Sequence, residues 1–407
     1  MRITITTLEK YLGFSVIIIA GLSTILRPSI DSKITLFRII LPFLFFYFFT
    51  KKPKRALEFI KISLIFFIYS LFVSLVVSRF QNFSIPYFFY YIVVIFFYYF
   101  SQSIIETSSI NSTYKFLKNL FRLLLVLGCI QLLFGGIYFN TQDRLPAVNV
   151  FFWNENEFSS VIAIFTPLYF LAEKNKLKYI WIIIALYLMY HNDSKLALIS
   201  VLLFFFGYYM IKLKVFRKKY IGFFFLGVFM VVILFYLRDF NIAGRFTVEI
   251  FVTEFFEHLF YLEPFEHIGS FQSRSNAIIL GIKEFINSWF LGIGPGNSIS
   301  MLNEIVIPGT ENWTALSMHN FIFQIITEIG ILGIFLFLIV FFKIKKAINA
   351  HIIHSSNIII LYYLSTIISV SLISGPWSNY FFLFIFYFSI FFFESNYESK
   401  TYHKKLS

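Results

Sequence analysis

Long apolar runs alternate with short polar connections along this chain of 407 residues. A helix needs roughly 20 apolar residues to cross the hydrocarbon core of a bilayer. Twelve runs approach that length, and we predict that each forms a membrane-spanning helix. The predicted spans lie near residues 9–26, 34–50, 59–78, 85–100, 119–139, 158–172, 179–190, 195–211, 220–237, 320–342, 357–374 and 379–393.

The composition excludes a soluble protein, because 58% of the residues are apolar, only 14% are charged and 60 are Phe. We therefore predict an all-α integral membrane protein of about twelve transmembrane helices with one large outer loop. Arg27 and Pro28 follow the first run, where a signal peptide would have small residues before its cleavage site. That run is interpreted as an uncleaved first helix. The single cysteine, Cys129, lies inside a predicted span and excludes an internal disulfide.

The basic residues predict the orientation, because Lys and Arg concentrate in loops that stay in the cytoplasm. With a cytoplasmic amino terminus, 23 of the 34 Lys and Arg residues fall in inner segments and nine in outer segments. Both termini are therefore predicted to be cytoplasmic. Arg38 and Arg122 lie inside spans, where we expect them to pair internally, or Arg122 to snorkel to the inner edge. The net charge of +13 then reflects topology and anionic lipid, so we expect no nucleic-acid partner.

One long outer loop divides the chain into three predicted parts: nine spans in 1–237, the loop in 238–319, and three spans with a tail in 320–407. A loop of this length is usually functional. The segment GIGPGN, Gly292 to Asn297, predicts a tight turn with close backbone approach. The residues before it predict a helix lying on the outer membrane surface. Its apolar face would hold Ile278, Ile282, Phe285, Ile286 and Trp289, and its polar face Lys283, Glu284 and Asn287.

Polar residues from distant segments meet on the predicted outer face. The sixth span begins after Asn154, Glu155 and Asn156, and the next hairpin ends at Lys195. Arg274 and His319 belong to the same side by topology. This face therefore holds cations for a phosphate and amides for a sugar. A groove between the loop and the bilayer would suit a substrate with a lipid tail and a polar head.

Four short pieces occur in order between residues 150 and 335. They are Asn154, Glu155 and Asn156; then Ser194 and Lys195; then Arg274, Trp289, Gly292 and Gly294; and last His319, Asn320, Gln324, Glu328, Gly330 and Gly333. Together they resemble the O-antigen polymerase and O-antigen ligase superfamily of polytopic membrane glycosyltransferases. The resemblance implies a glycosyltransferase C-like fold in the bacterial inner membrane, with the large loop and the active face in the periplasm.

Members of this superfamily transfer a glycan from undecaprenyl pyrophosphate without a metal or another cofactor. The resemblance assigns catalysis to Arg274, which would neutralise the leaving pyrophosphate, and to His319, which would take the proton of the acceptor hydroxyl or bind the pyrophosphate. It implies further contacts to pyrophosphate or glycan from Lys195, Arg245, Asn154, Glu155, Asn156, Asn320 and Glu328. It also implies an undecaprenyl-pyrophosphate-linked oligosaccharide and membrane lipids as partners, with a chain-length regulator and a flippase as further candidates.

Simpler interpretations stand beside these roles. His319 could be an interfacial polar residue, and Arg274 a solvated loop residue. Glu328 could join helices as a polar contact as readily as it could bind substrate. His258 and His267 lie nine residues apart and would face opposite sides of one helix, so we predict no metal site there.

The family pattern has Arg where this chain has Lys195, and lysine cannot form the planar bidentate fork. The first 140 residues match the family in hydropathy alone. This weak match and the departure at Lys195 favour a polymerase, because polymerases are the more divergent group. A polymerase would add the glycan to another lipid-linked repeat unit, whereas a ligase would add it to the lipid A core. A polysaccharide flippase or transporter is the third alternative, but no pair of Gly/Pro-interrupted spans occupies corresponding halves.

Overall fold

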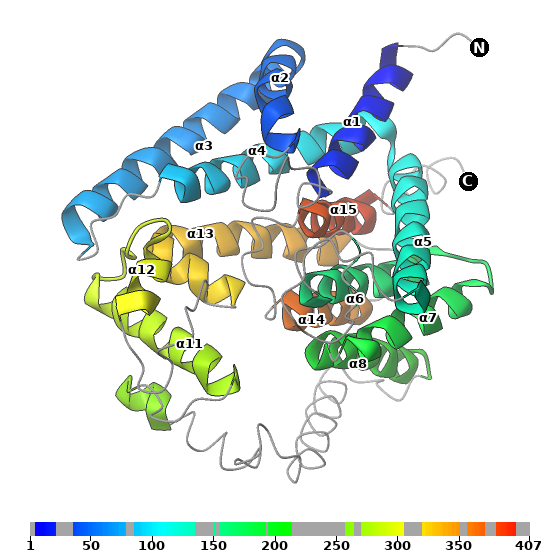
Figure 1. Cartoon of the computed structure of the whole chain (residues 1–407). Coiled ribbons are helices and arrows are strands. Elements are labelled where there is room, and N and C mark those ends of the chain that lie inside the picture. The colour runs from blue at the N-terminus through cyan, green and yellow to red at the C-terminus, as the bar shows by residue number, and fades with distance from the viewer. Residues whose placement is uncertain are drawn as a thin grey trace. The chain divides into compact units, whose positions relative to one another are not determined.

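The structure is a computed structural model, and all of its regular elements are helices over the residues that it describes (Figure 1). Those residues are 5–21, 36–78, 85–134, 148, 150, 155–192, 194–213, 257–263, 270–304, 320–350, 356–370 and 380–395.

Eleven of the twelve predicted spans coincide with a helix, while 220–237 lies outside the described residues. An apolar run of this length forms a helix because a helix satisfies its backbone hydrogen bonds within the segment. The helices in these runs are α1 (Ile5–Gly21), α2 (Leu36–Lys51), α3 (Pro53–Phe72) with the π-helical turn η1 (Val73–Val77), α4 (Ile85–Ser108), α5 (Ile110–Phe134), α6 (Glu155–Ala172), α7 (Lys178–His191), α8 (Lys195–Lys212), α13 (Phe321–Ala350), α14 (Ser356–Val370) and α15 (Tyr380–Ser395).

Four helical segments of the described chain are long and apolar enough to cross a membrane by length and composition: Pro53–Val77, Ile110–Phe134, Lys195–Lys212 and Ile322–Lys346. Four shorter apolar helices accompany them. The helical membrane-protein class is thus supported. The count of twelve spans, the division at residues 237 and 319, and the orientation stay predictions.

The chain forms two compact units. Unit 1 contains residues 1–63, 92–205 and 342–407, and unit 2 contains 64–91 and 206–341. Both units are discontinuous in sequence, because α3, α4, α8 and α13 each pass from one to the other. Each unit is described by itself below.

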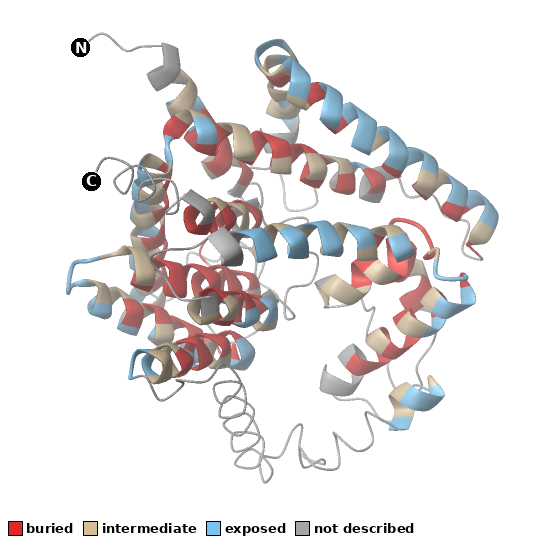
Figure 2. Cartoon of the chain, turned by 180° about the vertical axis from the view of Figure 1, so that it is seen from behind, coloured by how far each residue is buried: buried red, intermediate tan, exposed pale blue. Residues whose placement is uncertain are grey.

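Helix α6 forms the centre of unit 1. It packs against α7, α14 and α15 and is buried along almost its whole length (Figure 2). A hydroxyl joins it to α14, because Ser160 Oγ donates to the Ser369 carbonyl at 3.1 Å. The hydroxyls of Ser369 and Ser200 share a hydrogen bond at 2.5 Å, which joins α14 in turn to α8. Small polar side chains of this kind let membrane helices approach closely.

A charge cluster joins α5 to the end of α6 in unit 1. Lys118 Nζ lies 3.0 Å from a carboxylate oxygen of Glu173, and Arg122 Nη2 lies 3.5 Å from the same oxygen. Arg122 also donates to the Tyr169 hydroxyl at 2.8 Å, which confirms the predicted internal pairing. Burial alone would raise the pKa of Glu173, but hydrogen bonds from Lys118 and the Asn175 amide, with both cations, hold that pKa below its ordinary value of 4.5.

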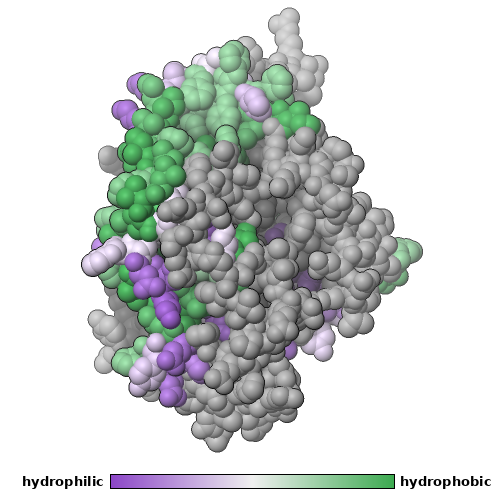
Figure 3. All heavy atoms as spheres, turned by 60° about the vertical axis from the view of Figure 1, so that its left-hand side comes forward, coloured by the Kyte–Doolittle hydropathy of each residue, from purple (hydrophilic) through white to green (hydrophobic). Residues whose placement is uncertain are grey.

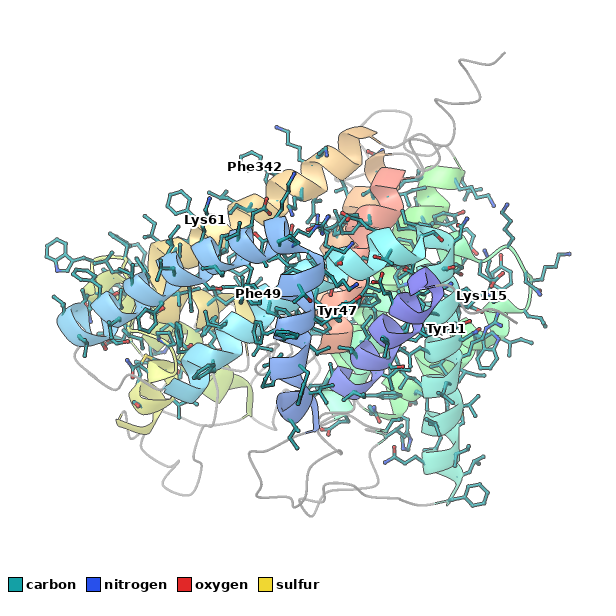
Figure 4. The ribbon with its side chains drawn as sticks, turned by 90° about the horizontal axis from the view of Figure 1, so that it is seen from above. Tyr11, Tyr47, Phe49, Lys61, Lys115 and Phe342 are labelled. Carbon is teal, nitrogen blue, oxygen red and sulfur yellow. The ribbon has the colours of Figure 1, made fainter. Side chains whose placement is uncertain are left out.

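The outside of unit 1 carries large apolar and aromatic side chains. Tyr11 on α1 and Phe342 in α13 are each 60% exposed at the surface of this unit (Figure 4). Figure 3 shows hydrophobic side chains, in green, gathered together at the surface and apart from hydrophilic ones. Apolar surface of this extent requires a nonaqueous neighbour, which fits helices that face lipid.

Unit 2 contains two helices of the predicted outer loop, α11 (Ser270–Asn287) and α12 (Asn297–Glu304), beside the first part of α13 (Figure 1). Helix α11 confirms the helix that we predicted before the GIGPGN segment. The predicted polar face is wrong at Glu284, which is only 4% exposed. The buried apolar residues at the centre of this unit are Ala277, Leu280, Ile293, Met301 and Leu302, with Phe323 packed against them.

Candidate functional site

The GIGPGN turn connects α11 to α12 and docks on α13 through backbone hydrogen bonds. The amide of Ile293 donates to the Thr327 carbonyl, and the amide of Gly294 donates to the Glu328 carbonyl, both at 2.8 Å. Gly292, Gly294 and Gly296 all have positive φ. We call this turn, residues 292–297, together with the interruption of α13 that receives it, the glycine junction.

Helix α13 is interrupted at Gly330, whose φ of 52° and ψ of −135° are not helical. The helix therefore ends at residue 329 and a second one starts at 331, which Figure 1 shows as a short and a long segment. Interruption frees the carbonyls of residues 327 and 328 from their helical partners, and the turn satisfies them. We had predicted one uninterrupted span over 320–342, so the interruption is a correction to that prediction.

Both glycines of the α13 motif have a geometric reason. A Cβ on Gly330 would overlap the carbonyl of Leu291, and its backbone conformation is open essentially to glycine alone. A Cβ on Gly333 would lie 2.6 Å from Ile325 Cγ2. In a straight helix Ile325 and Gly333 would be about 12 Å apart along the axis, so the chain folds back on itself here.

The carboxylate of Glu328 lies inside the glycine junction and is 0% exposed. The Tyr91 hydroxyl from α4 donates to Oε2 at 2.6 Å, and Gln324 Nε2 donates to Oε1 at 3.2 Å. The Ser298 hydroxyl from the first turn of α12 also donates to Oε1, and the Gly296 amide hydrogen-bonds the same carboxylate. A buried carboxylate without hydrogen bonds would be costly, so these donors stabilise it in place of a cation.

Further polar atoms surround the turn. Tyr69 donates its hydroxyl to the Leu291 carbonyl at 2.8 Å, and Asn297 Nδ2 donates to the Ile293 carbonyl. Within the described part of the chain, Asn297 Oδ1, Gln324 Oε1 and the Ser74 hydroxyl are buried and have no hydrogen-bond partner. Buried polar groups of this kind usually have a partner in the protein or an ordered water.

Unit 1 contains a second group of predicted residues. Ser194 donates its hydroxyl to Asn156 Oδ1 at 3.1 Å, which brings the start of α6 to the hairpin between α7 and α8. Asn192, buried to 7% exposure, donates to the Val148 carbonyl at 2.8 Å and accepts from the Val148 amide at 2.9 Å. It also donates to the Ser159 hydroxyl at 3.1 Å. We call Asn156, Asn192 and Ser194 the asparagine cluster.

The remaining predicted residues of unit 1 lie beside this cluster in sequence. Lys195 is the first residue of α8 and is exposed, and Glu155 is the first residue of α6 and is partly buried. Lys195 therefore stands next to Ser194, at the position where the resemblance places a phosphate-binding cation.

In unit 2, Asn320 caps α13. Its Oδ1 accepts the backbone amides of Ile322 at 3.1 Å and Phe323 at 3.3 Å, which is the usual role of asparagine before a helix. Arg274 belongs to α11, whose backbone is described there. His319, Arg245 and Asn154 lie outside the described residues.

Three contributors to these sites escaped the sequence analysis. Asn192 lies in the same polar hairpin as Ser194 and Lys195, but its burial could not be predicted from the sequence. Tyr91 lies in a run of aromatic residues and Ser298 in a short polar helix, and neither position has a distinguishing local pattern. Among the described residues, no group of three His, Cys, Asp or Glu side chains is placed to hold a metal ion.

Comparison with known proteins gives one family match. Residues 180–338 match the family described as O-antigen ligase. The matched region contains the Ser194 hairpin, α11 with Arg274, the glycine junction and the motif that begins at His319. No curated protein matches the chain. The match confirms the resemblance to the polymerase and ligase superfamily, whose members are glycosyltransferase-like enzymes, and is common to both activities.

Proposed function

We propose that this chain, an integral membrane protein with an O-antigen ligase domain in residues 180–338, is a polymerase of O-antigen or a related surface polysaccharide. It would transfer an undecaprenyl-pyrophosphate-linked glycan onto another lipid-linked repeat unit at the periplasmic face of the inner membrane. The family match supports glycosyl transfer by either activity, because it includes the predicted cations, the glycine junction and the histidine in one continuous region.

The proposed transfer exchanges one bond for another. The acceptor hydroxyl oxygen forms a bond to the anomeric carbon of the donor sugar, and the bond from that carbon to the pyrophosphate oxygen breaks. His319 takes the hydroxyl proton, and undecaprenyl pyrophosphate leaves with the bonding electrons. Arg274, with Lys195 and Arg245, neutralises the charge that develops on the pyrophosphate. No nucleotide sugar or metal is required.

The glycine junction supports this assignment by its place in the chain. Arg274 lies on the helix before the turn, and His319 lies one residue before Asn320, the cap of α13. The turn and α13 are joined by backbone hydrogen bonds, and Glu328 ties α12 to them. Arg274 therefore lies on one of these joined segments and His319 adjoins the other in sequence, an arrangement that would suit the positioning of catalytic groups.

A ligase is the second candidate, because the matching family carries that description. A ligase would use the same donor and the same cations, but its acceptor would be a sugar of the lipid A core. The departure at Lys195 favours the polymerase, since a lysine binds phosphate as a point charge without the planar fork of arginine.

The test is a gel of surface lipopolysaccharide from cells that lack this protein. The cells are complemented with the unmutated chain, Arg274→Ala or His319→Ala, and each protein is quantified in membranes. We expect core carrying a single repeat unit in the null strain and in both variants. Bare core with polymer held on undecaprenyl pyrophosphate would identify a ligase. Repeat units that stay on the cytoplasmic side would identify a flippase.

Two control variants separate these residues from their surroundings. His258→Ala removes another histidine of the predicted loop, and Lys176→Ala removes an exposed cation from the turn between α6 and α7. Both should give a normal ladder. A normal ladder from Arg274→Ala and His319→Ala as well would remove the site assignment.

A further inference from the structure

The turn that ends α11 is strained at two aromatic residues. Trp289 has a φ of 55° and Phe290 a φ of 64°, a region that bulky residues rarely adopt. Hydrogen bonds on both sides hold this conformation: the Phe290 amide donates to the Phe285 carbonyl at 2.9 Å, and the Ile331 amide donates to the Phe290 carbonyl at 2.8 Å. Strain of this kind persists only where the surroundings determine it.

The strained turn places its side chains on the outside of unit 2. Trp289 is 82% exposed and Phe290 is 51% exposed. Lys283 and Ile286 precede them on α11 and are also exposed. Residues 283 and 286 are neighbours one helical turn apart, so the lysine and the isoleucine meet where the polar and apolar faces of α11 join.

This exposed group lies beside two apolar surfaces. The second part of α13 begins at Ile331, which bonds directly to Phe290, and α3 reaches the same turn through the hydrogen bond from Tyr69 to the Leu291 carbonyl. Neither 331–342 nor 64–78 contains a charged residue. The exposed apolar residues are Ile331, Phe335, Leu338 and Ile339 on α13, and Leu64, Ile65, Ile68, Phe72, Leu75 and Val76 on α3 and η1.

We propose that Trp289, Phe290 and Lys283 form an anchor that lies in the phospholipid headgroup layer. The uncharged segments of α13 and α3 need hydrocarbon. The α13 segment begins at Ile331, which bonds to Phe290, so we place the turn at the hydrocarbon boundary. Tryptophan prefers this boundary because its ring is apolar and its indole N–H is polar. The exposed ammonium of Lys283 complements lipid phosphates. Bilayer phospholipid is therefore the occupant that matches the group in both polarity and charge.

The anchor would set the height of the glycine junction in the membrane, since Trp289 is only three residues from Gly292. Relying on the proposed function, this height matches that of a lipid-linked pyrophosphate at the bilayer surface. The anchor itself needs no glycosyl transfer, and its test is independent of activity.

The test uses the full chain with Trp289 as its single tryptophan, after Trp153, Trp181, Trp313 and Trp377 are changed to Phe. The purified protein is placed in vesicles of phosphatidylcholine and phosphatidylglycerol, with bromine atoms either high on the acyl chains or near their methyl ends. We expect strong quenching of Trp289 fluorescence by the shallow bromines, weak quenching by the deep ones, and little quenching by aqueous iodide.

A second variant gives the depth reference. Phe341→Trp, made together with Trp289→Phe, puts the single tryptophan about 15 Å further along α13, near the bilayer centre. It should be quenched most by the deep bromines, which also shows that the chain is folded and inserted. Strong iodide quenching of Trp289 would overturn the anchor. Blue-shifted emission that neither lipid nor iodide quenches would overturn it too, and would indicate contact with another protein chain.

Discussion

The asparagine cluster and the glycine junction hold site residues in different ways. In the asparagine cluster, Asn156 and Ser194 stand at the starts of regular helices and meet through side-chain hydrogen bonds. In the glycine junction, the contacts are mostly between backbone groups, and a helix must be interrupted at Gly330 to supply them. The first arrangement tolerates changes in side chains, whereas the second depends on residues that permit an unusual backbone.

This difference predicts where a substitution will most reduce the amount of folded protein. Hydrogen bonds between side chains in membrane proteins contribute about 1 kcal/mol each, because the groups find other partners when one is lost. A backbone that only glycine adopts has no such alternative. Substitutions should therefore be more severe in the glycine junction than in the asparagine cluster.

The largest effect is expected from Gly330→Ala. The added Cβ would overlap the Leu291 carbonyl, and the backbone conformation by itself costs about 1 to 3 kcal/mol for a residue other than glycine. We expect almost no polymer and little folded protein in membranes. Gly333→Ala is the matched comparison and should be milder, because its Cβ would meet the Cγ2 methyl of Ile325 first and it needs no positive φ. Equal damage from both variants would contradict the account of the interruption.

The next effect is expected at Glu328. Glu328→Ala leaves donors of Tyr91, Ser298 and Gln324 without an acceptor, at a cost of about 1 to 3 kcal/mol for each donor left unpaired. Glu328→Gln keeps one oxygen acceptor and should retain more folded protein and more polymer. Thermal unfolding in detergent, with the polymer ladder, measures both. If Gln is as harmful as Ala, the negative charge itself is needed and the hydrogen bonds are not sufficient.

A smaller effect is expected in the asparagine cluster. Asn192→Ala removes the contacts that hold Val148 and Ser159 to the hairpin, and should lower stability by about 1 to 2 kcal/mol. The polymer ladder should shorten or weaken but persist. Asn175→Ala, in the exposed turn after α6, is the control and should leave the ladder unchanged. Complete loss of polymer from Asn192→Ala would show that the two regions do not differ as proposed.

The smallest effect concerns pH and the charge cluster at Glu173. Its pKa is lowered in the folded protein, so its stabilising contribution is present above pH 4.5 and is lost as the pH falls through the folded value. Glu173→Gln should lower the unfolding temperature slightly at neutral pH, by no more than about 1 kcal/mol of stability. The difference from the unmutated chain should vanish in acid. A difference that grows as the pH falls would contradict this sign.

Hydropathy predicted most of the fold, because membrane-spanning helices are specified by length and apolarity. It did not predict the interruption of α13, since Gly330 and Gly333 are ordinary residues of a membrane helix until the turn from residues 292–297 is known to dock there. The sequence motif drew attention to both glycines and to Glu328, for which substrate binding and a polar contact between helices were equal alternatives. The structure surrounds that carboxylate with Tyr91, Ser298 and Gln324.

The candidate site was predicted in part for the same reason. Topology alone placed Asn156 and the Ser194 hairpin on one face, and their hydrogen bond agrees with that placement. The contribution of Tyr91 depends on a contact between residues 237 positions apart, which no local pattern reveals. Long-range contacts between buried polar groups therefore could not be predicted from the sequence.

Reconstitution of the transfer reaction tests the central claim most directly. The purified chain is placed in vesicles with the lipid-linked repeat unit alone, or with that donor and lipid A core, and the products are separated by size. The account predicts a ladder of lipid-linked polymer from the donor alone, no ladder with Arg274→Ala, and a normal ladder with His258→Ala. Glycan that appears only on the lipid A core would contradict the polymerase assignment, and no transfer to either acceptor would contradict the glycosyltransferase itself.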